Sequence, residues 1–253
     1  GPGLLGALMI GLQAAKTLSY IHQIPLIGVN HMAGHVFGNF IGKEKWDVQY
    51  PFLCLVVSGG HTMLVIAHSD TQFETIGRTI DDAAGESYDK VARLLKLGYP
   101  GGPVVDKTAA LGDPHKIKFM RAKHVDAGGE FDFSFSGLKT AVINYYRKHP
   151  EASAPDMCAA FQQTVIDELV AKTMAAVKKY KLPRFYMAGG VAANKSLRKA
   201  LTAAAEQAGV QFSVPDFVFC TDNAAMIGGA AIPKFLRREF STLDLQADPG
   251  LKL

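Results

Sequence analysis

The chain has 253 residues with a formal net charge of +4, of which 48% are hydrophobic and 20% charged. This length suits one large or two modest domains, and no apolar run approaches the roughly 20 residues that cross a bilayer, which excludes a membrane-spanning protein. The mild positive charge permits a nucleic-acid partner but falls short of a dedicated nucleic-acid binder. No secretory signal is visible and the three cysteines are widely spaced, so a cytoplasmic location is expected.

The first 40 residues predict a helix, a strand and a second helix. Leucines recur at helical spacing within residues 4–22, which predicts a helix. The apolar run at residues 24–30 predicts a short buried strand. Residues 30–40 predict a helix that begins at Asn30, whose side chain can accept a hydrogen bond from a free backbone N–H.

The middle of the chain predicts a hairpin, two helices and a loop. Two β-branched runs at residues 52–68 are joined through a Ser-Gly-Gly turn and predict a hairpin. Residues 79–98 predict a helix, and the glycines and prolines of residues 98–103 predict a loop. Phenylalanines alternate along residues 131–135 as in a strand, and Ser136 is expected to cap a following helix.

The last third repeats a strand-to-helix pattern. Residues 159–180 predict a long helix, and residues 184–209 predict a strand, a Gly-Gly turn and a helix. Residues 217–236 predict a strand, a polar turn and a helix rich in alanine and glycine. The hairpin in the middle argues against a purely parallel sheet, so we expect an α/β fold with mixed sheets flanked by helices.

Two histidines suggest a metal site. His31 and His35 lie four residues apart on a predicted helix, so their rings project from the same face and can share an ion. A packed or solvent-facing pair is an equally good interpretation of that spacing alone. Asp222 follows a predicted strand and could supply a third ligand, although spacing alone favours it as the cap of the next helix.

Paired glycines at three turns suggest a bound nucleotide. Such turns expose backbone N–H groups to phosphate or sugar oxygens, whereas ordinary turn formation is the alternative for any single pair. The pairs are Gly59 and Gly60, Gly101 and Gly102, and Gly189 and Gly190. The Walker motif GxxxxGK[ST] does not occur. Asp89, Asp106 and Asn194 lie near these turns and could bind ribose hydroxyls, or could serve only as caps and turn residues.

Eight ordered segments together resemble a known family. They are GPGLLGAL, NHMAGH, LVVSGGHT, GESYDK, GYPGGP, FSFSGLKTA, AGGVAAN and CTDNAAM. Their order and sequences resemble the signature blocks of the bacterial TsaD family, formerly labelled O-sialoglycoprotein endopeptidases. The resemblance covers essentially the whole chain. It implies an actin-like fold of two lobes, of the sugar-kinase and Hsp70 type, with nucleotide bound between them.

The resemblance also implies a reaction and its site. Members of this family transfer a threonylcarbamoyl group from threonylcarbamoyl-adenylate to the adenosine beside the anticodon, in tRNAs that read codons beginning with A. One divalent metal ion, iron or zinc, would be held by His31, His35 and Asp222. An adenine nucleotide, threonylcarbamoyl-adenylate or ATP, would be bound by Val56, Val57, Ser58, Gly59, Gly60, Asp89, Gly102, Asp106 and Asn194. His61 is a candidate general base, but no base is assigned.

The resemblance further implies partners and a division of the chain. The expected partners are tRNA, a TsaB-type paralogous subunit and a TsaE-type small ATPase, and the helix within residues 4–22 is the expected docking face for the paralogue. Family members normally carry further residues before GPGL, so the chain is expected to be N-terminally truncated. Residues 1–50 would be the remainder of the first lobe, residues 51–225 the second lobe, and residues 226–253 a helix returning to the first.

Three other functions remain to be weighed. A metalloprotease of the HExxH type needs Glu beside the first ligand, where this chain has Met32, so proteolysis is disfavoured. A small-molecule kinase of the same fold would bind ATP with Mg²⁺ and need no histidine pair. A non-catalytic nucleotide-binding scaffold within a multiprotein complex is the third alternative.

Overall fold

A five-stranded mixed sheet forms the centre of the computed structural model, which describes residues 1–43, 48–119 and 128–253. The strand order is β3-β2-β1-β4-β5. The first three strands pair antiparallel, and β4 and β5 extend the sheet in parallel with β1. The strands are β1 (Phe52–Val57), β2 (Thr62–Ala67), β3 (Phe73–Arg78), β4 (Arg184–Ala188) and β5 (Gln211–Ser213).

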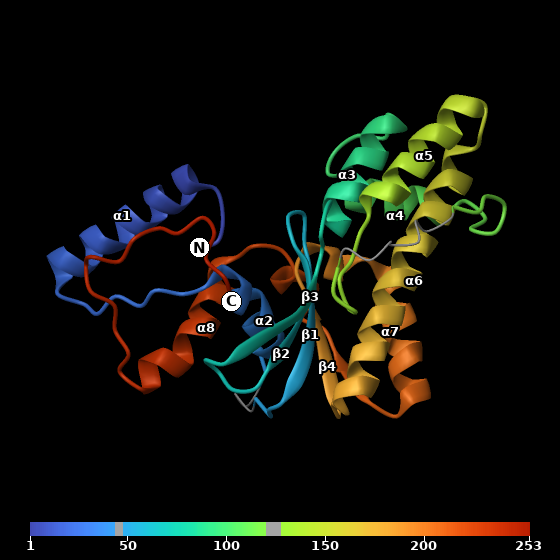
Figure 1. The fold of residues 1–253 in the computed structure, drawn as a ribbon. Coiled ribbons are helices and arrows are strands. Elements are labelled where there is room, and N and C mark those ends of the chain that lie inside the picture. The colour runs from blue at the N-terminus through green and yellow to red at the C-terminus, as the bar shows by residue number, and fades with distance from the viewer. Residues whose placement is uncertain (44–47, 120–127) are drawn as a thin grey trace.

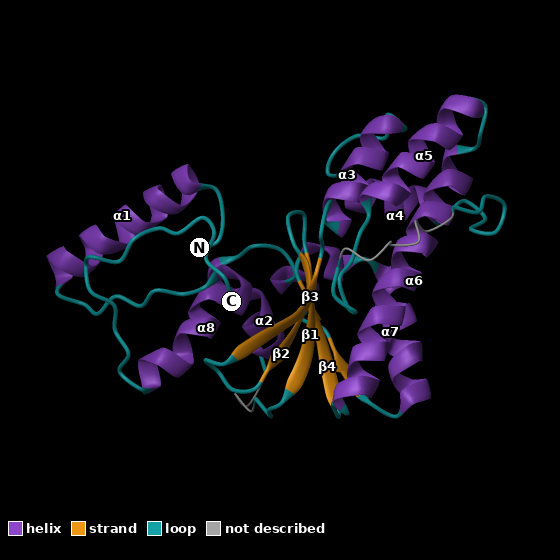
Figure 2. Ribbon diagram, viewed as in Figure 1, coloured by secondary structure: helices purple, strands orange, loops and turns teal. Residues whose placement is uncertain are grey.

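Helices lie on both sides of the sheet, with α3 to α7 on one side and α1, α2 and α8 on the other (Figures 1 and 2). The α-helices are α1 (Leu5–His22), α2 (His31–Phe37), α3 (Ala84–Leu94), α4 (Gly101–Ala109), α5 (Ser136–Lys148), α6 (Ala154–Tyr180), α7 (Lys195–Ala208) and α8 (Ala224–Leu236). The short 3₁₀ segments are η1 (Gly38–Phe40), η2 (Gly190–Ala193) and η3 (Phe217–Phe219). No helix among the described residues is both long and apolar enough to span a membrane.

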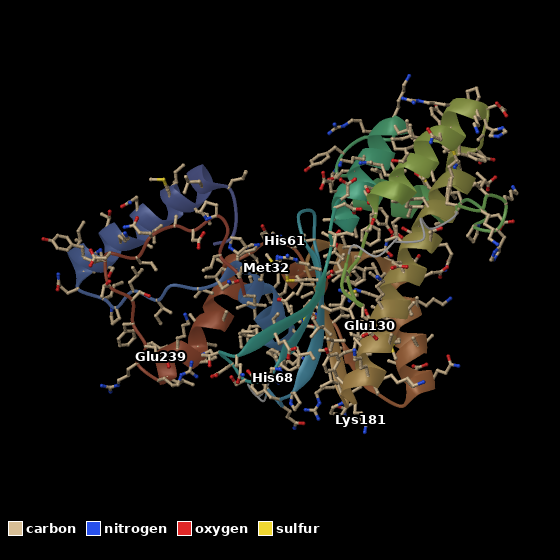
Figure 3. All side chains as sticks on the ribbon, viewed as in Figure 1. Met32, His61, His68, Glu130, Lys181 and Glu239 are labelled. Carbon is tan, nitrogen blue, oxygen red and sulfur yellow. The ribbon has the colours of Figure 1, made fainter. Side chains whose placement is uncertain are left out.

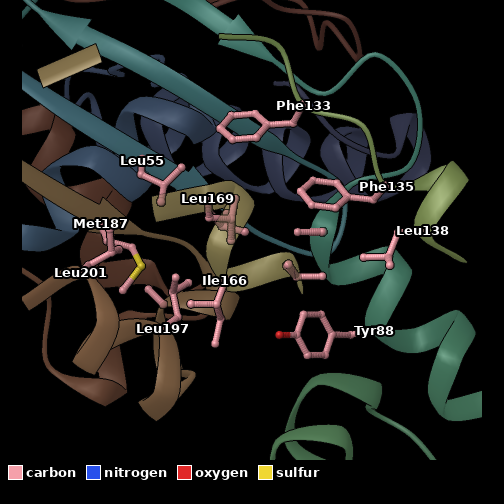
Figure 4. Close-up of a cluster of buried hydrophobic side chains, with 14 of the residues drawn as sticks. Leu55, Tyr88, Phe133, Phe135, Leu138, Ile166, Leu169, Met187, Leu197 and Leu201 are labelled. Carbon is pink, nitrogen blue, oxygen red and sulfur yellow. The ribbon is translucent and has the colours of Figure 1, made fainter. Parts of the chain in front are cut away.

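Two hydrophobic cores form because both faces of β1 are covered. Alternate residues of a strand point to opposite faces. Leu53, Leu55 and Val57 therefore join the larger core beneath α3 to α7, while Cys54 and Val56 join the smaller core with α2 and α8. Figure 4 shows side chains of the larger core, including Tyr88 near Ile166. The result is a fully buried central strand whose carboxyl end leads directly into the Ser-Gly-Gly turn.

Several predicted elements are present where the sequence placed them. β1 and β2 form the expected hairpin, with Val57 paired to Thr62 across the turn. Asn30 caps α2, because its Oδ1 accepts hydrogen bonds from the backbone N–H groups of Met32 and Ala33 at 2.8 and 3.3 Å. The long α6 and the strand-to-helix unit of β4 and α7 are also confirmed. The predicted mixed α/β class of fold is therefore correct.

Three predicted strands are absent from the described chain. Residues 131–135 form only a single parallel bridge, between Thr79 and Phe133. Residues 24–30 form only a single bridge, between Leu26 and Ser241, since no strand lies beside them to continue the ladder. Residues 217–219 form the 3₁₀ segment η3, with Phe217 and Val218 exposed to solvent and Phe217 stacked beneath the Arg198 guanidinium. In each place a run of strand-like composition lacks the partner strand that would extend it into a ladder.

Two helix starts differ from the prediction. Helix α4 begins inside the segment predicted as a loop, because Pro103 falls in the first helical turn, where no backbone N–H is needed. Helix α5 starts at Ser136, which does not act as its cap. Instead, the Asp81 carboxylate accepts hydrogen bonds from the backbone N–H groups of Phe135 and Ser136 and from the hydroxyls of Ser134 and Ser136.

Candidate functional site

Helix α2 presents two histidines on one face, as the four-residue spacing predicts. The rings of His31 and His35 lie 4.8 Å apart between centroids and are nearly perpendicular. His35 is buried, whereas about a quarter of the His31 side chain is exposed. The pair therefore lies at the boundary between the smaller core and solvent, with one ring fixed by packing and the other accessible.

Asp222 completes a cluster of three ligand atoms. Its Oδ1 lies 3.5 Å from Nε2 of His31 and 3.2 Å from Nε2 of His35, and all three ligand atoms lie within 4.8 Å of one another. The interpretation of Asp222 as a helix cap is wrong, because Asn223 caps α8 by accepting a hydrogen bond from the Met226 N–H at 2.8 Å. The Asp222 carboxylate is thus free of a capping role and 74% exposed.

Within the part of the chain that the structure describes, His35 lacks the hydrogen-bond partners that a packed histidine normally has. Among the described residues, neither ring nitrogen of this buried side chain has a hydrogen-bond partner, although Asp222 lies close to Nε2. Buried polar atoms are normally satisfied, so an orphaned imidazole needs an explanation. Burial, reinforced by the nearby His31, lowers the pKa of His35 to about 4, and a neutral imidazole is the form that binds metal. The donor set of two imidazoles and a carboxylate fits iron or zinc.

His61 lies close to this cluster. It follows the Ser-Gly-Gly turn, and Figure 3 shows it in the same region of the molecule as Met32, the residue after His31. Burial lowers the pKa of His61, and a positive charge on His31 would lower it further. His61 is therefore neutral at neutral pH and is close enough to His31 and Asp222 to interact with both.

Arg198 of α7 holds the loop that leads to Asp222, a contact that the sequence does not reveal. Its Nη2 donates hydrogen bonds to the Pro215 carbonyl at 2.9 Å and to the Cys220 sulfur at 3.0 Å. Its Nε donates to the carbonyl of Ala192 at 2.5 Å, and its guanidinium lies 4.1 Å above the Phe217 ring. One side chain thus joins the loop before Asp222 to the turn that follows β4.

Two of the predicted nucleotide-binding turns meet at the carboxyl ends of β1 and β4. Val56 and Val57 are buried within β1, whereas Gly59 and Gly60 of the following turn are exposed. A Cβ built on either of these glycines would meet nothing within 4 Å. The Ser58 hydroxyl accepts a hydrogen bond from the His61 N–H at 3.1 Å, which holds the turn closed. The turn therefore offers open backbone to a ligand.

The predicted ribose-binding residues form two separate contacts. Asp89 accepts a hydrogen bond from the Gly101 N–H at 2.7 Å, at the start of α4 and next to Gly102. Asp106 accepts one from the side-chain amide of Asn194 at 3.2 Å. Both acidic residues are half-buried, so each has a structural partner as well as surface left for a ligand.

Gln162 is a residue of this region that sequence reasoning missed. It lies in α6 and is buried, and its amide donates a hydrogen bond to Asp106 at 3.0 Å. Its carbonyl oxygen accepts a hydrogen bond from Asn194 at 2.9 Å. A single glutamine inside a long helix carries no sequence signal of such a role, because any helical residue facing a core would occupy the same spacing.

A separate groove of about 950 Å³ lies between α1, residues 26–31 and the C-terminal segment. His31 reaches its edge, but none of the predicted nucleotide-binding residues lines it. No residue of α1 is fully buried, and Leu4, Ile10 and Tyr20 are among the apolar side chains exposed along this region. The groove is therefore distinct from the turns at the ends of β1 and β4.

Solved structures of other proteins share the fold of this chain. The fold resembles a crystal structure of full-length HypF in a phosphate- and nucleotide-bound form, with a TM-score of 0.65, 13% identity, and coverage of 83% of this chain and 43% of that one. HypF from T. kodakarensis aligns with a TM-score of 0.66 and 15% identity over 88% of this chain and 39% of its own. These likenesses concern the fold alone, and they support the expected actin-like α/β class.

Sequence relatives identify the family. A protein from Clostridium botulinum strain 657 named tRNA N6-adenosine threonylcarbamoyltransferase is 49% identical over all of this chain and 74% of its own length. Proteins of the same name from Halalkalibacterium halodurans and Kosmotoga olearia are 50% and 49% identical, with 73% and 75% of their lengths covered. The model of the family described as "TsaD: tRNA N6-adenosine threonylcarbamoyltransferase" matches residues 1–229. The chain therefore belongs to the TsaD family of tRNA N6-adenosine threonylcarbamoyltransferases.

Proposed function

We propose that this chain transfers a threonylcarbamoyl group from threonylcarbamoyl-adenylate to N6 of the adenosine beside the anticodon, in tRNAs that read codons beginning with A. The observation that carries the proposal is the cluster of His31, His35 and Asp222 at the end of the sheet, together with family membership. In the reaction a bond forms between N6 and the carbamoyl carbon, the bond from that carbon to the adenylate oxygen breaks, N6 loses a proton and AMP leaves.

His31, His35 and Asp222 would hold one divalent ion, iron or zinc. Three protein ligands leave coordination positions for a substrate, as in catalytic rather than structural sites. Bound there, the ion would act as a Lewis acid toward the carbonyl of the threonylcarbamoyl group. The chain contributes a preformed donor set, since packing fixes His35 and the Asn30 cap fixes the start of the helix that carries both histidines.

The adenylate would lie along the turns at the ends of β1 and β4. Open backbone at Gly59 and Gly60 can approach phosphate oxygens, because no Cβ holds the ligand away. Asp106 and Asn194 would bind the ribose, together with Asp89 and Gly102 at the start of α4. This placement brings the adenylate to the same end of the sheet as the metal ligands, so the leaving phosphate and the carbonyl can be bound at once.

The transfer itself tests the function. The chain should be loaded with zinc or iron, combined with the partner subunits, threonylcarbamoyl-adenylate and a tRNA that reads ANN codons, and the nucleosides analysed by mass spectrometry. We expect the modified adenosine only beside the anticodon, and none when that adenosine is replaced by guanosine. Formation of AMP without modified tRNA, at the same rate with and without tRNA, would contradict the proposal.

Gly102 provides a test of the nucleotide site that does not depend on catalysis. A Cβ at this position meets nothing within 4 Å, so Gly102→Ala should fold with little change in stability. If the nucleotide lies against this backbone, the added methyl group should weaken AMP binding by about tenfold or more. Isothermal titration calorimetry with AMP measures the effect. Gly209→Ala is unsuitable as a control because Gly209 has φ +67°, whereas Gly228→Ala is matched, since its Cβ also meets nothing within 4 Å. Equal affinity in the Gly102 and Gly228 variants would place the nucleotide elsewhere.

Partners and domain division follow from the same proposal. The expected partners are tRNA, a TsaB-type subunit docking on α1, and a TsaE-type ATPase. The exposed apolar residues of α1 support a docking role for that helix.

Residues 1–50 and 226–253 would form one lobe and residues 51–225 the other. The packing of α2 against α8 and the bridge from Leu26 to Ser241 support joining the first and last segments. A cytoplasmic location is in keeping with three free, buried cysteines.

A further inference from the structure

Gln162 lies at the centre of a small polar network that includes two of the proposed nucleotide-binding residues. Its amide nitrogen donates to Asp106 at 3.0 Å and faces the Ser196 hydroxyl at 3.4 Å. Its oxygen accepts from Asn194 at 2.9 Å and from the Tyr88 hydroxyl at 3.4 Å. Gln162 is only 5% exposed, so the network is shielded from water on the side of α6.

The helix cap formed by Asn194 fixes the direction of both side-chain amides in this network. Asn194 caps α7, and its Oδ1 must accept the hydrogen bond from the Leu197 N–H at 2.8 Å. The Asn194 amide nitrogen therefore points the other way, toward Asp106 and the Gln162 oxygen. Because the Gln162 oxygen is then the acceptor, its nitrogen must face Asp106. The orientation of both amide side chains follows from one helix cap.

The network leaves part of Asp106 available. Both amide donors, from Gln162 and Asn194, are directed to Oδ1 of Asp106. A carboxylate can accept hydrogen bonds at both oxygens, so Oδ2 can still receive a hydroxyl proton. Gln162, in contrast, has its donors and its acceptor turned toward protein groups. It can therefore set the position of Asp106 without itself contacting a ligand.

We propose that Gln162 is a positioning residue for nucleotide binding, one that fixes the rotamers of Asp106 and Asn194 so that the free Asp106 oxygen receives a ribose hydroxyl. The inference rests on the proposed adenylate site. Without Gln162, Asn194 would lose an acceptor for its buried amide, and Asp106 would lose one of the two donors that hold its carboxylate. The side chains of Asp106 and Asn194 would then have to become ordered when the nucleotide binds, which lowers the binding affinity.

The first test compares Gln162→Met with Gln163→Met in the full chain. Both changes remove an amide of the same size from neighbouring positions of α6, but Gln163 faces solvent and bonds only to Asp167 among the hydrogen bonds recorded for the described residues. With AMP as the probe, we expect Gln162→Met to bind about tenfold or more weakly than the wild type and Gln163→Met to bind as the wild type does. Zinc binding should be unchanged in both variants.

A second variant tests position rather than mere folding. Gln162→Glu keeps the shape of the side chain but places an oxygen where the donor faced Asp106. Two carboxylates that share a site raise the pKa of one of them, and the protonated form can again donate a hydrogen bond. We therefore expect the AMP affinity of Gln162→Glu, relative to the wild type at each pH, to recover as the pH falls from about 8 to 5. This profile keeps the proposal testable if Gln162→Met folds poorly.

The outcomes separate this inference from the function on which it rests. Asp106→Ala and Asn194→Ala, measured with the same probe, report on the nucleotide site itself. If they weaken AMP binding while Gln162→Met does not and Gln162→Glu shows no pH dependence, the positioning role is wrong and the site stands. If none of the four variants affects AMP binding, the adenylate site is wrong and the positioning role falls with it.

Discussion

Replacement of His35 with alanine is expected to reduce bound zinc or iron from about one ion per chain to a small fraction of that. His35 supplies one of three ligand atoms, and a site left with two holds an ion poorly. Loss of even an indirect partner of a ligand costs 10- to 100-fold in affinity, so loss of the ligand itself should cost at least about 100-fold. Threonylcarbamoyl transfer should fall by a similar factor or more. Elemental analysis after dialysis measures the number of ions bound per chain. Competition with a chromogenic chelator measures the affinity for the ion.

His68 offers a matched control for this experiment. It also lies beside a carboxylate, with its Nε2 2.9 Å from Glu74, but this pair is exposed; His68 follows the last residue of β2, and Glu74 lies in β3. His68→Ala should keep both metal and activity, whereas Asp222→Ala should behave as His35→Ala does. Metal retained at wild-type level in His35→Ala, or lost equally in His68→Ala, would show that the ion is bound elsewhere.

Gly189→Ala should unfold far more readily than the wild type. Gly189 has φ +91°, and a Cβ there would lie 2.4 Å from the Val57 carbonyl oxygen. Val57 ends β1 and Gly189 follows the last residue of β4. The two strands pair through Val56 and Ala188, so neither backbone can move away without disrupting the sheet. The clash and the unfavourable φ together should lower the free energy of unfolding by about 3 to 5 kcal/mol. Urea denaturation followed by circular dichroism measures this change.

The adjacent glycine is the natural comparison. Gly190 has no positive φ, and the atom nearest to a Cβ placed there is the Thr221 methyl carbon at 3.9 Å, an ordinary contact. Gly190→Ala should therefore change the free energy of unfolding by about 1 kcal/mol or less. Equal stability of the two variants would mean that the β1 and β4 ends can separate, contrary to the packing described here.

Local signals in the sequence predicted the elements whose stability is decided locally. Asn30 caps α2 with its own side chain, and the apolar alternation around the Ser-Gly-Gly turn fixes the register of the hairpin. The prediction was wrong where a distant group decides. Residues 24–30 needed a partner strand, and α5 is capped by Asp81, which lies more than 50 residues earlier in the chain. Composition near an element cannot reveal such a partner.

The candidate site shows the same contrast between features set by local sequence and features set by distant residues. The spacing of His31 and His35 placed both rings on one face, but spacing alone assigned Asp222 to a cap that Asn223 provides. Family resemblance added Asp222 to the metal ligands, and the structure brings its carboxylate to the two rings. Gln162 was not found because its role depends on the Asn194 amide nitrogen pointing away from α7, which only the assembled structure reveals.

The separation of the metal ligands along the chain has a consequence for biosynthesis. The two histidines lie in α2, ahead of every strand of the sheet, whereas Asp222 follows all five strands. A nascent chain on the ribosome therefore carries only the histidine pair until all five strands have been translated. An ion held by all three ligands can be acquired only after β4 and α8 have reached the rest of the fold, so metal loading is a late event and reports that folding is complete.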